Sequence, residues 1–466
     1  MPPFRPSENG SPRSSRREFL RFGLAGLGSL SLTDLMRLQA QAGATKSERT
    51  ALILVWLRGG ASHLETYDPK PMASSEYRGP YQPISTRVPG LQISELLPRQ
   101  AQIADKFTIV RSMAHTGGGH PAGSLQLLSG DTAAQDKPKP EFPDLMTVAN
   151  YLRADPTRKM PNYVAVNGIH NYDNFVIAGP AYLGAAYEPF RVNGDPNHPQ
   201  FEIPNIGLRK EQETERLNER IGLRKSLDRL CRDLDQLGAM RALDAFELQA
   251  ANLLTSSEAR HAFDLNKEDS QLRDRYGRNS WGQQCLMARR LVEAGVELIT
   301  TVFDGPLCGR VANWDDHAVN HHVFEALKFR APAFDQAVSA LIEDVYARGL
   351  DKKVMVVVTG EFGRTPRIST AADSGSGRTQ PGRDHWPAAN SMLFSGGGIR
   401  HGAVIGATDV RGEEVIERRF GVGDFLATVY RHLGIDAQNV AIPNLSGRPI
   451  PILNDGSPIP ELMRSV

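Results

Sequence analysis

Four short segments of the chain are rich in apolar residues and predict buried β-strands. They cover residues 51–57, 106–113, 296–303 and 353–360. A continuous apolar run of this length is typical of a strand that is buried on both faces. Apolar residues at helical spacing occur between these runs, most clearly over 334–350, where Gly349 is placed to end a helix. Strands that alternate with helices predict an α/β fold of three layers, with a mostly parallel sheet between helices.

Residues 208–294 differ in composition from the rest of the chain. The segment has no proline and is rich in arginine, glutamate, leucine, glutamine and alanine, which is typical of long helices. Its acidic and basic residues are interleaved, as on solvated helix faces. We therefore expect a helical insertion or cap at about 208–294, within a single domain that spans residues 45–466.

The charge balance excludes some classes of function. The 466 residues include 54 lysines and arginines against 53 aspartates and glutamates, a formal net charge of +1. A chain so evenly balanced carries no electrostatic footprint for nucleic acid. It has no run of about 18 or more apolar residues, so we expect no membrane-spanning helix. Cys231, Cys285 and Cys308 are widely spaced and odd in number, and we interpret them as small buried thiols.

The first 44 residues have the features of an export signal. Arg16 and Arg17 precede a moderately apolar stretch, and "AQAGA" at 40–44 offers small residues to a signal peptidase. The string "SRREFL" closely resembles the twin-arginine signal, which a receptor reads and which exports folded proteins. We therefore predict that residues 1–44 are a twin-arginine signal peptide, recognised by the twin-arginine export machinery. The mature protein is then periplasmic or extracellular.

Polar residues crowd the segment that follows the first apolar run. Gly59 and Gly60 permit a tight turn, and residues 62–68 then include a serine, a histidine and two acids. One interpretation is a loop that supplies ligands or an anion-binding nest. The other is a turn with a solvated acidic face.

A second polar segment, residues 111–130, joins a predicted strand to a predicted helix. Three glycines at 117–119 lead to a helix that starts near Pro121, and backbone N–H groups at such a helix start favour an anion. His115 and His120 flank the glycines. They are candidate ligands or acid/base groups near a reacting centre.

The stretch "NWDDHAVNHH" at 313–322 follows the strand predicted at 296–303. Asp315 or the acid beside it can cap a helix, which would place His317 in the first turn and His321 one turn later on the same face. Two such histidines beside a carboxylate suit a divalent metal. The alternative is an ordinary capped surface helix.

A fourth polar segment follows the last strong strand, over residues 356–387. Glu361 lies just past the strand end, where a carboxylate can be a metal ligand or a general base, and Arg364 suits an oxyanion. "GRDHWP" then places Asp384 and His385 side by side. The acids could instead pair with arginines for structural reasons.

Taken in order, these segments resemble an exported family of unknown function, numbered 1501, which is considered a distant branch of the alkaline phosphatase and sulfatase superfamily. The resemblance covers nearly the whole chain and is carried by the leader and by "SHLETYDPKP", "YGRNSWGQQCLMARRLVEAGVELITTV", "WDDH", "TGEFGRTPRI" and "GRDHWP". It implies an alkaline phosphatase-like fold.

The resemblance also implies a set of metal ligands. Asp315, His317, Glu361 and His385 stand where the superfamily has ligands, and the ion would be a divalent metal such as zinc or calcium. The chain departs from the superfamily at two points. "VWLRGG" lacks the ligand aspartate that normally ends the first strand, and His120 stands where a cysteine or serine nucleophile would be.

The resemblance implies an exported, metal-dependent, hydrolase-like protein that acts on a phosphate or sulfate ester. The substrate would be a small anionic ester or a sulfated or phosphorylated glycan. Arg364 would steady the anionic group, and His115 or His120 would act near the reacting centre. The alternative is a non-catalytic exported protein that keeps the fold and uses its cleft to bind a glycan, an anion or a protein partner.

Overall fold

The structure is a computed structural model that describes residues 49–155, 158–203, 256–308, 310 and 313–463. The predicted signal peptide and most of the segment predicted as a helical insertion lie outside these residues. Within the described part of the chain, no helix is both long and apolar enough to cross a membrane.

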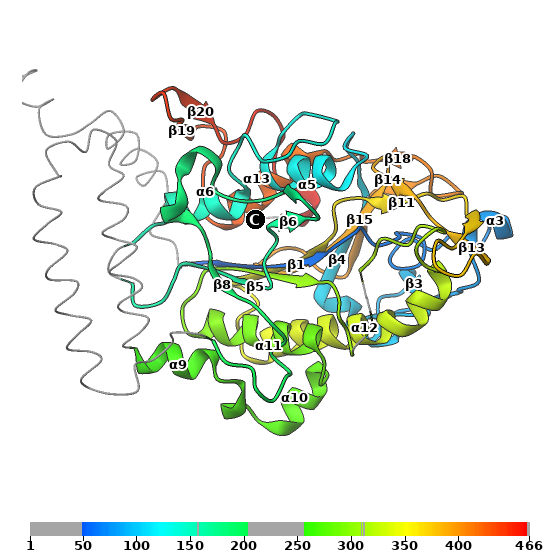
Figure 1. Cartoon of the computed structure of the whole chain (residues 1–466), viewed down its shortest axis with the longest axis horizontal. Coiled ribbons are helices and arrows are strands. Elements are labelled where there is room, and N and C mark those ends of the chain that lie inside the picture. The colour runs from blue at the N-terminus through cyan, green and yellow to red at the C-terminus, as the bar shows by residue number, and fades with distance from the viewer. Residues whose placement is uncertain (1–48, 156–157, 204–255, 309, 311–312, 464–466) are drawn as a thin grey trace, which may run out of the picture.

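An eight-stranded sheet forms the centre of the molecule (Figure 1). Its strands, from one edge to the other, are β16 (Ala403–Ile405), β4 (Phe107–Met113), β15 (Asn390–Gly396), β10 (Val354–Thr359), β1 (Ala51–Leu57), β9 (Leu298–Phe303), β5 (Tyr163–Val166) and β8 (Phe190–Val192). β15 is antiparallel to both of its neighbours, and every other pair in this sheet is parallel. The predicted α/β fold with a mostly parallel sheet is confirmed.

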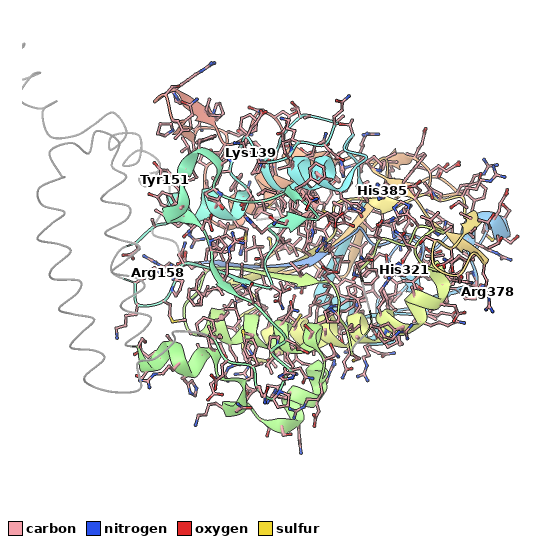
Figure 2. The ribbon with its side chains drawn as sticks, viewed as in Figure 1. Lys139, Tyr151, Arg158, His321, Arg378 and His385 are labelled. Carbon is pink, nitrogen blue, oxygen red and sulfur yellow. The ribbon has the colours of Figure 1, made fainter. Side chains whose placement is uncertain are left out.

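Helices cover both faces of the sheet (Figure 1). α11 (Ser280–Glu293) and α12 (Val323–Ala347) lie on one face, and α5 (His120–Ser129), α6 (Leu145–Leu152) and α13 (Val422–His432) lie on the other. Side chains fill both spaces between the layers (Figure 2). β1 shows why: Ile53 and Val55 belong to the core cluster on the α11 and α12 side, whereas Leu54 and Trp56 belong to the opposite one. Because alternate side chains of a strand point to opposite faces, a strand buried on both faces is apolar throughout.

Shorter elements surround these layers. They are the helices α3 (Ser75–Arg78), α4 (Pro98–Gln102), α9 (Ser257–Phe263) and α10 (Ser270–Tyr276), and the two-stranded pairs β2/β3 (Pro83–Ser85, Gln92–Ser94), β6/β7 (Asn171–Tyr172, Phe175–Val176), β11/β14 (Gly363–Arg364, His385–Trp386), β12/β13 (Ser369–Ala372, Thr379–Gly382), β17/β18 (Ala407–Thr408, Val415–Glu417) and β19/β20 (Ala441–Pro443, Pro449–Pro451). The part of the 208–294 segment that is described includes α11, which is buried and packs against β9 and α12.

Two local predictions are wrong. The helix expected to start beside Asp315 instead begins at Val323, where the ring of His322 accepts a hydrogen bond from the backbone N–H of Glu325. His317 therefore lies in a loop. Cys308, expected to be buried, is exposed, whereas Cys285 is buried as predicted.

Candidate metal centre

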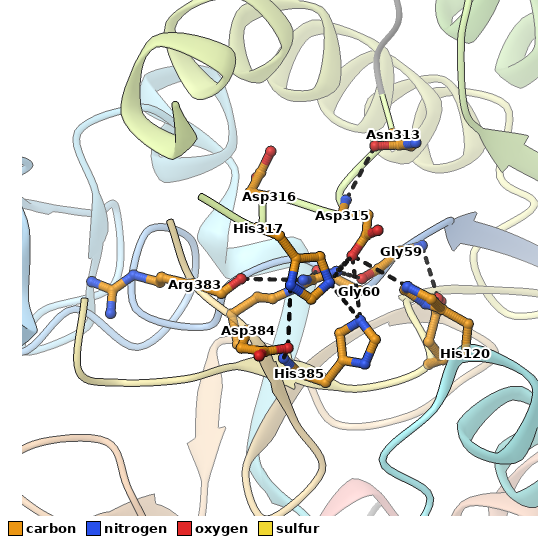
Figure 3. A network of polar contacts seen from close by, with 12 residues as sticks. Gly59, Gly60, His120, Asn313, Asp315, Asp316, His317, Arg383, Asp384 and His385 are labelled. Carbon is orange, nitrogen blue, oxygen red and sulfur yellow. Dashed lines mark hydrogen bonds and ion pairs between the residues drawn. The ribbon is translucent and has the colours of Figure 1, made fainter. Parts of the chain in front are cut away.

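Residues that follow four strands of the sheet meet at its carboxyl edge, three through their side chains and Gly59 through its backbone (Figure 3). Gly59 follows β1, His120 follows β4, Asp315 follows β9 and Glu361 follows β10. His385 comes from β14, the short strand that pairs with β11. Open α/β folds place their ligand sites at this edge, because the loops that leave parallel strands converge there.

Three imidazoles converge on one carboxylate. The Nε2 atoms of His120, His317 and His385 lie 3.2, 2.8 and 3.3 Å from Oδ1 of Asp315. The Nε2 atoms of His317 and His385 are 2.9 Å apart. The four residues together offer ligand atoms that all lie within 4.8 Å of one another.

These separations fit a bound divalent ion. Tetrahedral bonds of about 2.0–2.1 Å from nitrogen or oxygen place neighbouring ligand atoms about 3.3 Å apart. The distances of 2.8–3.3 Å in the structure come close to that spacing. A hydrogen bond could explain the short contact between His317 and His385 alone. A single bound ion would explain the positions of all four residues.

The outward nitrogen of each ring is held by an oxygen atom. His120 Nδ1 donates to Glu361 Oε1 at 2.7 Å, His385 Nδ1 donates to the carbonyl of Gly118 at 2.7 Å, and His317 Nδ1 lies 3.2 Å from Asp384 Oδ1. A hydrogen on each Nδ1 leaves the lone pair on Nε2, which faces the centre. This is the arrangement of metal-bound histidines, whose second nitrogen donates to a carboxylate or carbonyl.

Glu361 lies behind His120 and outside the four-residue group. Its side chain is fully buried, its Oε1 also accepts a hydrogen bond from the backbone N–H of Gly59 at 2.9 Å, and its Oε2 has no hydrogen-bond partner among the described residues. The resemblance implied the reverse arrangement, with Glu361 as a ligand and His120 near the reacting centre. The structure instead brings His120 Nε2 into the group.

Arg364 supports the group from the side of β1. Its side chain is buried, its Nη2 lies 2.8 Å from Asp315 Oδ1, and its Nε donates to the carbonyl of Gly60 at 3.0 Å. Further bonds run to the carbonyls of Gly59 and Arg383. These contacts direct the guanidinium toward Asp315 and the backbone.

The charges of the group stabilise one another. Burial raises the pKa of the Asp315 carboxyl. When the imidazole Nε2 atoms carry protons in place of an ion, hydrogen bonds from His120, His317 and His385, together with the charge of Arg364, hold that pKa far below its usual range. Burial lowers the pKa of His120, but its bonds to Asp315 and Glu361 outweigh burial and raise that pKa overall. Asp315 is therefore ionised and available as a ligand over the whole physiological pH range.

His115 lies outside the four-residue group. Its Nε2 is 2.6 Å from the backbone carbonyl of Glu361, and its Nδ1 accepts a hydrogen bond from the N–H of Gly117. These contacts fix the two loops that follow β4 and β10.

The N-terminus of α5, expected to face an anion, is occupied by the chain itself, because Asp136 Oδ1 accepts from the N–H of Ala122 at 3.0 Å.

The polar segment that follows β1 is buried, and its side chains contact other parts of the chain. Glu65 forms an ion pair with Arg383, and both side chains are fully buried. His63 Nε2 contacts the carbonyl of Gly412 at 2.9 Å, and Asp68 Oδ1 lies 3.0 Å from Lys70 Nζ. The alternative of a solvated acidic face is therefore wrong, because these groups hold loops together beneath the site.

Tyr172 is a site neighbour that the sequence did not indicate. Its ring stacks on His120 with centroids 3.9 Å apart, and its Oη lies 3.0 Å from His120 Nε2. It belongs to the short β6/β7 pair, where no motif or periodicity distinguishes it from other loop tyrosines.

The fold and the site define an α/β protein with a candidate metal centre at the carboxyl edge of its sheet. Residues 49–463 match the model of the family described as "Protein of unknown function (DUF1501)", and the chain belongs to this family. No functionally curated protein matches it.

Several solved structures show weak similarity. The structure of Ps i-CgsB in complex with k-i-k-neocarrahexaose is 10% identical with a TM-score of 0.37, and the match covers 84% of this chain and 73% of that one. The PsFucS1 sulfatase from Pseudoalteromonas sp. is 10% identical with a TM-score of 0.34, and the match covers 87% of this chain and 72% of that one. The phosphonate monoester hydrolase SpPMH from Silicibacter pomeroyi is 11% identical with a TM-score of 0.36, and the match covers 89% of this chain and 76% of that one.

Proposed function

We propose that this chain is an exported, metal-dependent hydrolase that acts on a phosphate or sulfate ester. The observation that carries the proposal is the convergence of three imidazole Nε2 atoms on one carboxylate oxygen, at the carboxyl edge of a mostly parallel sheet. The sequence resemblance points to the ester class.

His120, Asp315, His317 and His385 would hold the ion. Three nitrogens and one oxygen suit zinc or a similar transition metal better than calcium, which takes six to eight oxygen ligands. The chemistry that such an ion supplies is polarisation of an ester oxygen and a lower pKa for an attacking water.

Residues around the four ligands orient them. Glu361 fixes the tautomer and orientation of His120, and Arg364 orients Asp315. Tyr172 places its Oη beside His120 Nε2, within reach of a group bound at the centre. Among the described residues, no serine, threonine or cysteine side chain hydrogen-bonds to the four ligands, so water is the nucleophile that the site favours.

Turnover tests the proposal. The purified full chain, supplied in turn with zinc, manganese and calcium, is assayed with an aryl phosphate, an aryl sulfate and an aryl phosphodiester. We expect hydrolysis of at least one ester with zinc or manganese. We expect its loss in His317→Ala and His385→Ala, and its retention in His321→Ala, a neighbouring histidine outside the group. A metal-loaded protein that hydrolyses none of the three classes would contradict the proposal and favour a binding role.

Export has its own test. Replacement of Arg16 and Arg17 by lysine keeps the charge but removes the arginine pair that the receptor reads. We expect the native chain to accumulate outside the cytoplasm and the variant to remain inside, as measured by cell fractionation. Equal distribution of the two would contradict twin-arginine export.

A further inference from the structure

The hydroxyl of Tyr172 lies beside the candidate metal centre without a well-placed acceptor. Its Oη is 3.0 Å from His120 Nε2, but the two rings stack with their planes 11° apart and their centroids 3.9 Å apart. In this stack the hydroxyl oxygen lies over the face of the imidazole, whereas the lone pair of Nε2 lies in the plane of that ring. The contact is therefore a weak hydrogen bond, and the hydroxyl can donate to a better acceptor.

The ring of Tyr172 is held by two segments that also build the site. His120, at the start of α5, stacks on it, and the guanidinium carbon of Arg58, just after β1, lies 4.4 Å from its centroid. Arg58 is itself fixed by an ion pair with Asp304, which follows β9, at 2.8 Å. A buried ring held in this way loses little conformational freedom when its hydroxyl binds a ligand.

The other side-chain donors around the centre are already engaged. Arg364, which the resemblance implied for the anionic group, is buried and directs its guanidinium at Asp315 and at three backbone carbonyls. The Nδ1 atoms of the three histidines each face an oxygen atom of the chain. Among the described residues, Tyr172 has the only side-chain hydroxyl that contacts the four ligands.

The centre is open enough to admit an anion. The side chains of Asp315, His317 and His385 are 16, 21 and 18% exposed. A tyrosine hydroxyl carries its proton at neutral pH, so it can donate to an oxygen of phosphate or sulfate. A hydrogen bond to a charged oxygen is about twice as strong as one between neutral groups.

We propose that the Tyr172 hydroxyl donates a hydrogen bond to an oxygen of the phosphate or sulfate group at the metal centre. The inference rests on the proposed function, from which it takes the ion and the ester class. It adds a substrate-binding residue outside the four ligands. Because the hydroxyl lies off the plane in which His120 Nε2 directs its lone pair, Tyr172 contacts the substrate and leaves the ion to the ligands.

Anion binding to the zinc-loaded full chain tests this role without turnover. Calorimetric titration with inorganic phosphate and with inorganic sulfate measures the affinity for the anion. Competition with a chelator measures the affinity for zinc. Tyr172→Phe keeps the stacked ring and removes only the hydroxyl. We expect it to bind the preferred anion about tenfold more weakly than the wild type and to bind zinc equally well.

Tyr346→Phe is the matched control. A cation also lies over the ring of Tyr346, with Lys106 Nζ 5.5 Å from its centroid, and the hydroxyl donates to the backbone carbonyl of Lys106 at 3.0 Å. Tyr346 lies in the last turn of α12 and contacts none of the four ligands. We expect wild-type affinities for anion and zinc in this variant, with both variants folded by circular dichroism.

Three outcomes would overturn the inference. They are equal anion affinity in the wild type and Tyr172→Phe, a zinc-loaded wild type that binds neither anion, and a parallel loss of zinc affinity, which would mean that the hydroxyl acts on the ion or its ligands. Tyr172-dependent anion binding by a protein that hydrolyses no ester would overturn the proposed function and leave this inference standing. Ester hydrolysis at the wild-type rate by Tyr172→Phe would do the reverse.

Discussion

At the scale of single residues, the site depends on which nitrogen of each histidine faces inward. The sequence indicated the residue types and the loops that carry them, so Asp315, His317 and His385 could be singled out before their positions were known. It could not indicate that His120 turns Nε2 toward Asp315 while Glu361 holds its other nitrogen. That orientation depends on the path of the chain through Gly117 to Gly119, which no periodicity encodes.

The contact between Glu361 and His120 gives the first prediction. Glu361→Gln keeps the shape of the side chain but removes the charge that orients and polarises the imidazole. Loss of such a supporting carboxylate weakens metal binding by roughly 10- to 100-fold. Competition with a chelator of known affinity measures the change, and the exposed Glu417→Gln is the control. Unchanged affinity in Glu361→Gln would contradict this role for Glu361.

At the scale of elements, the close approach of two loops positions the ligands. Gly382, the last residue of β13, lies shortly before His385 in β14, and a Cβ atom built on it would lie 1.9 Å from the backbone nitrogen of Ala318 and 2.6 Å from the carbonyl carbon of His317. Both contacts are with backbone, so no side chain can move aside. Only glycine lets these two segments meet.

Gly382→Ala should therefore weaken metal binding although every ligand remains. We expect at least about a tenfold loss of affinity, because a displacement of about 1 Å separates His317 from His385. Gly375→Ala is the matched control, since this exposed residue lies outside the site and its Cβ would meet only Asp373 Oδ1, at 3.4 Å. Calorimetric titration with zinc measures both. Wild-type affinity in Gly382→Ala would show that the loops tolerate the extra atom.

The end of α13 gives a prediction about pH. His432 Nε2 lies 2.9 Å from the carbonyl of Ala51 in β1, and burial lowers the pKa of His432 to about 4 from an ordinary 6.5. The unfolded chain therefore binds the proton more readily than the folded one. The stability that neutral His432 contributes to the fold is complete above pH 6.5 and is lost as the pH falls through 4.

The loss should amount to about 1–3 kcal/mol of unfolding free energy between pH 7 and pH 4. Denaturant unfolding across that range measures it, with His432→Gln as the comparison. The variant should show a flatter dependence on pH. Identical slopes for the two proteins would mean that His432 does not couple α13 to the sheet in this way.

At the scale of the whole molecule, the apolar runs were sufficient to predict the layers. β1, β4, β9 and β10 lie within two residues of the predicted segments, because strands buried on both faces are rich in apolar side chains, although β4 and β9 also include threonines. The direction of β15 could not be predicted, since apolar alternation is the same in both directions along a strand. The convergence of four loops at one edge follows from the parallel topology.

The metal content of the purified full chain tests the central claim most directly. The account predicts about one divalent ion per chain by elemental analysis, zinc in preference to calcium, after purification or reconstitution. It predicts loss of that ion in His317→Ala and His385→Ala and its retention in His321→Ala, with all variants folded by circular dichroism. A folded wild-type protein that binds no divalent ion even after reconstitution would contradict the account.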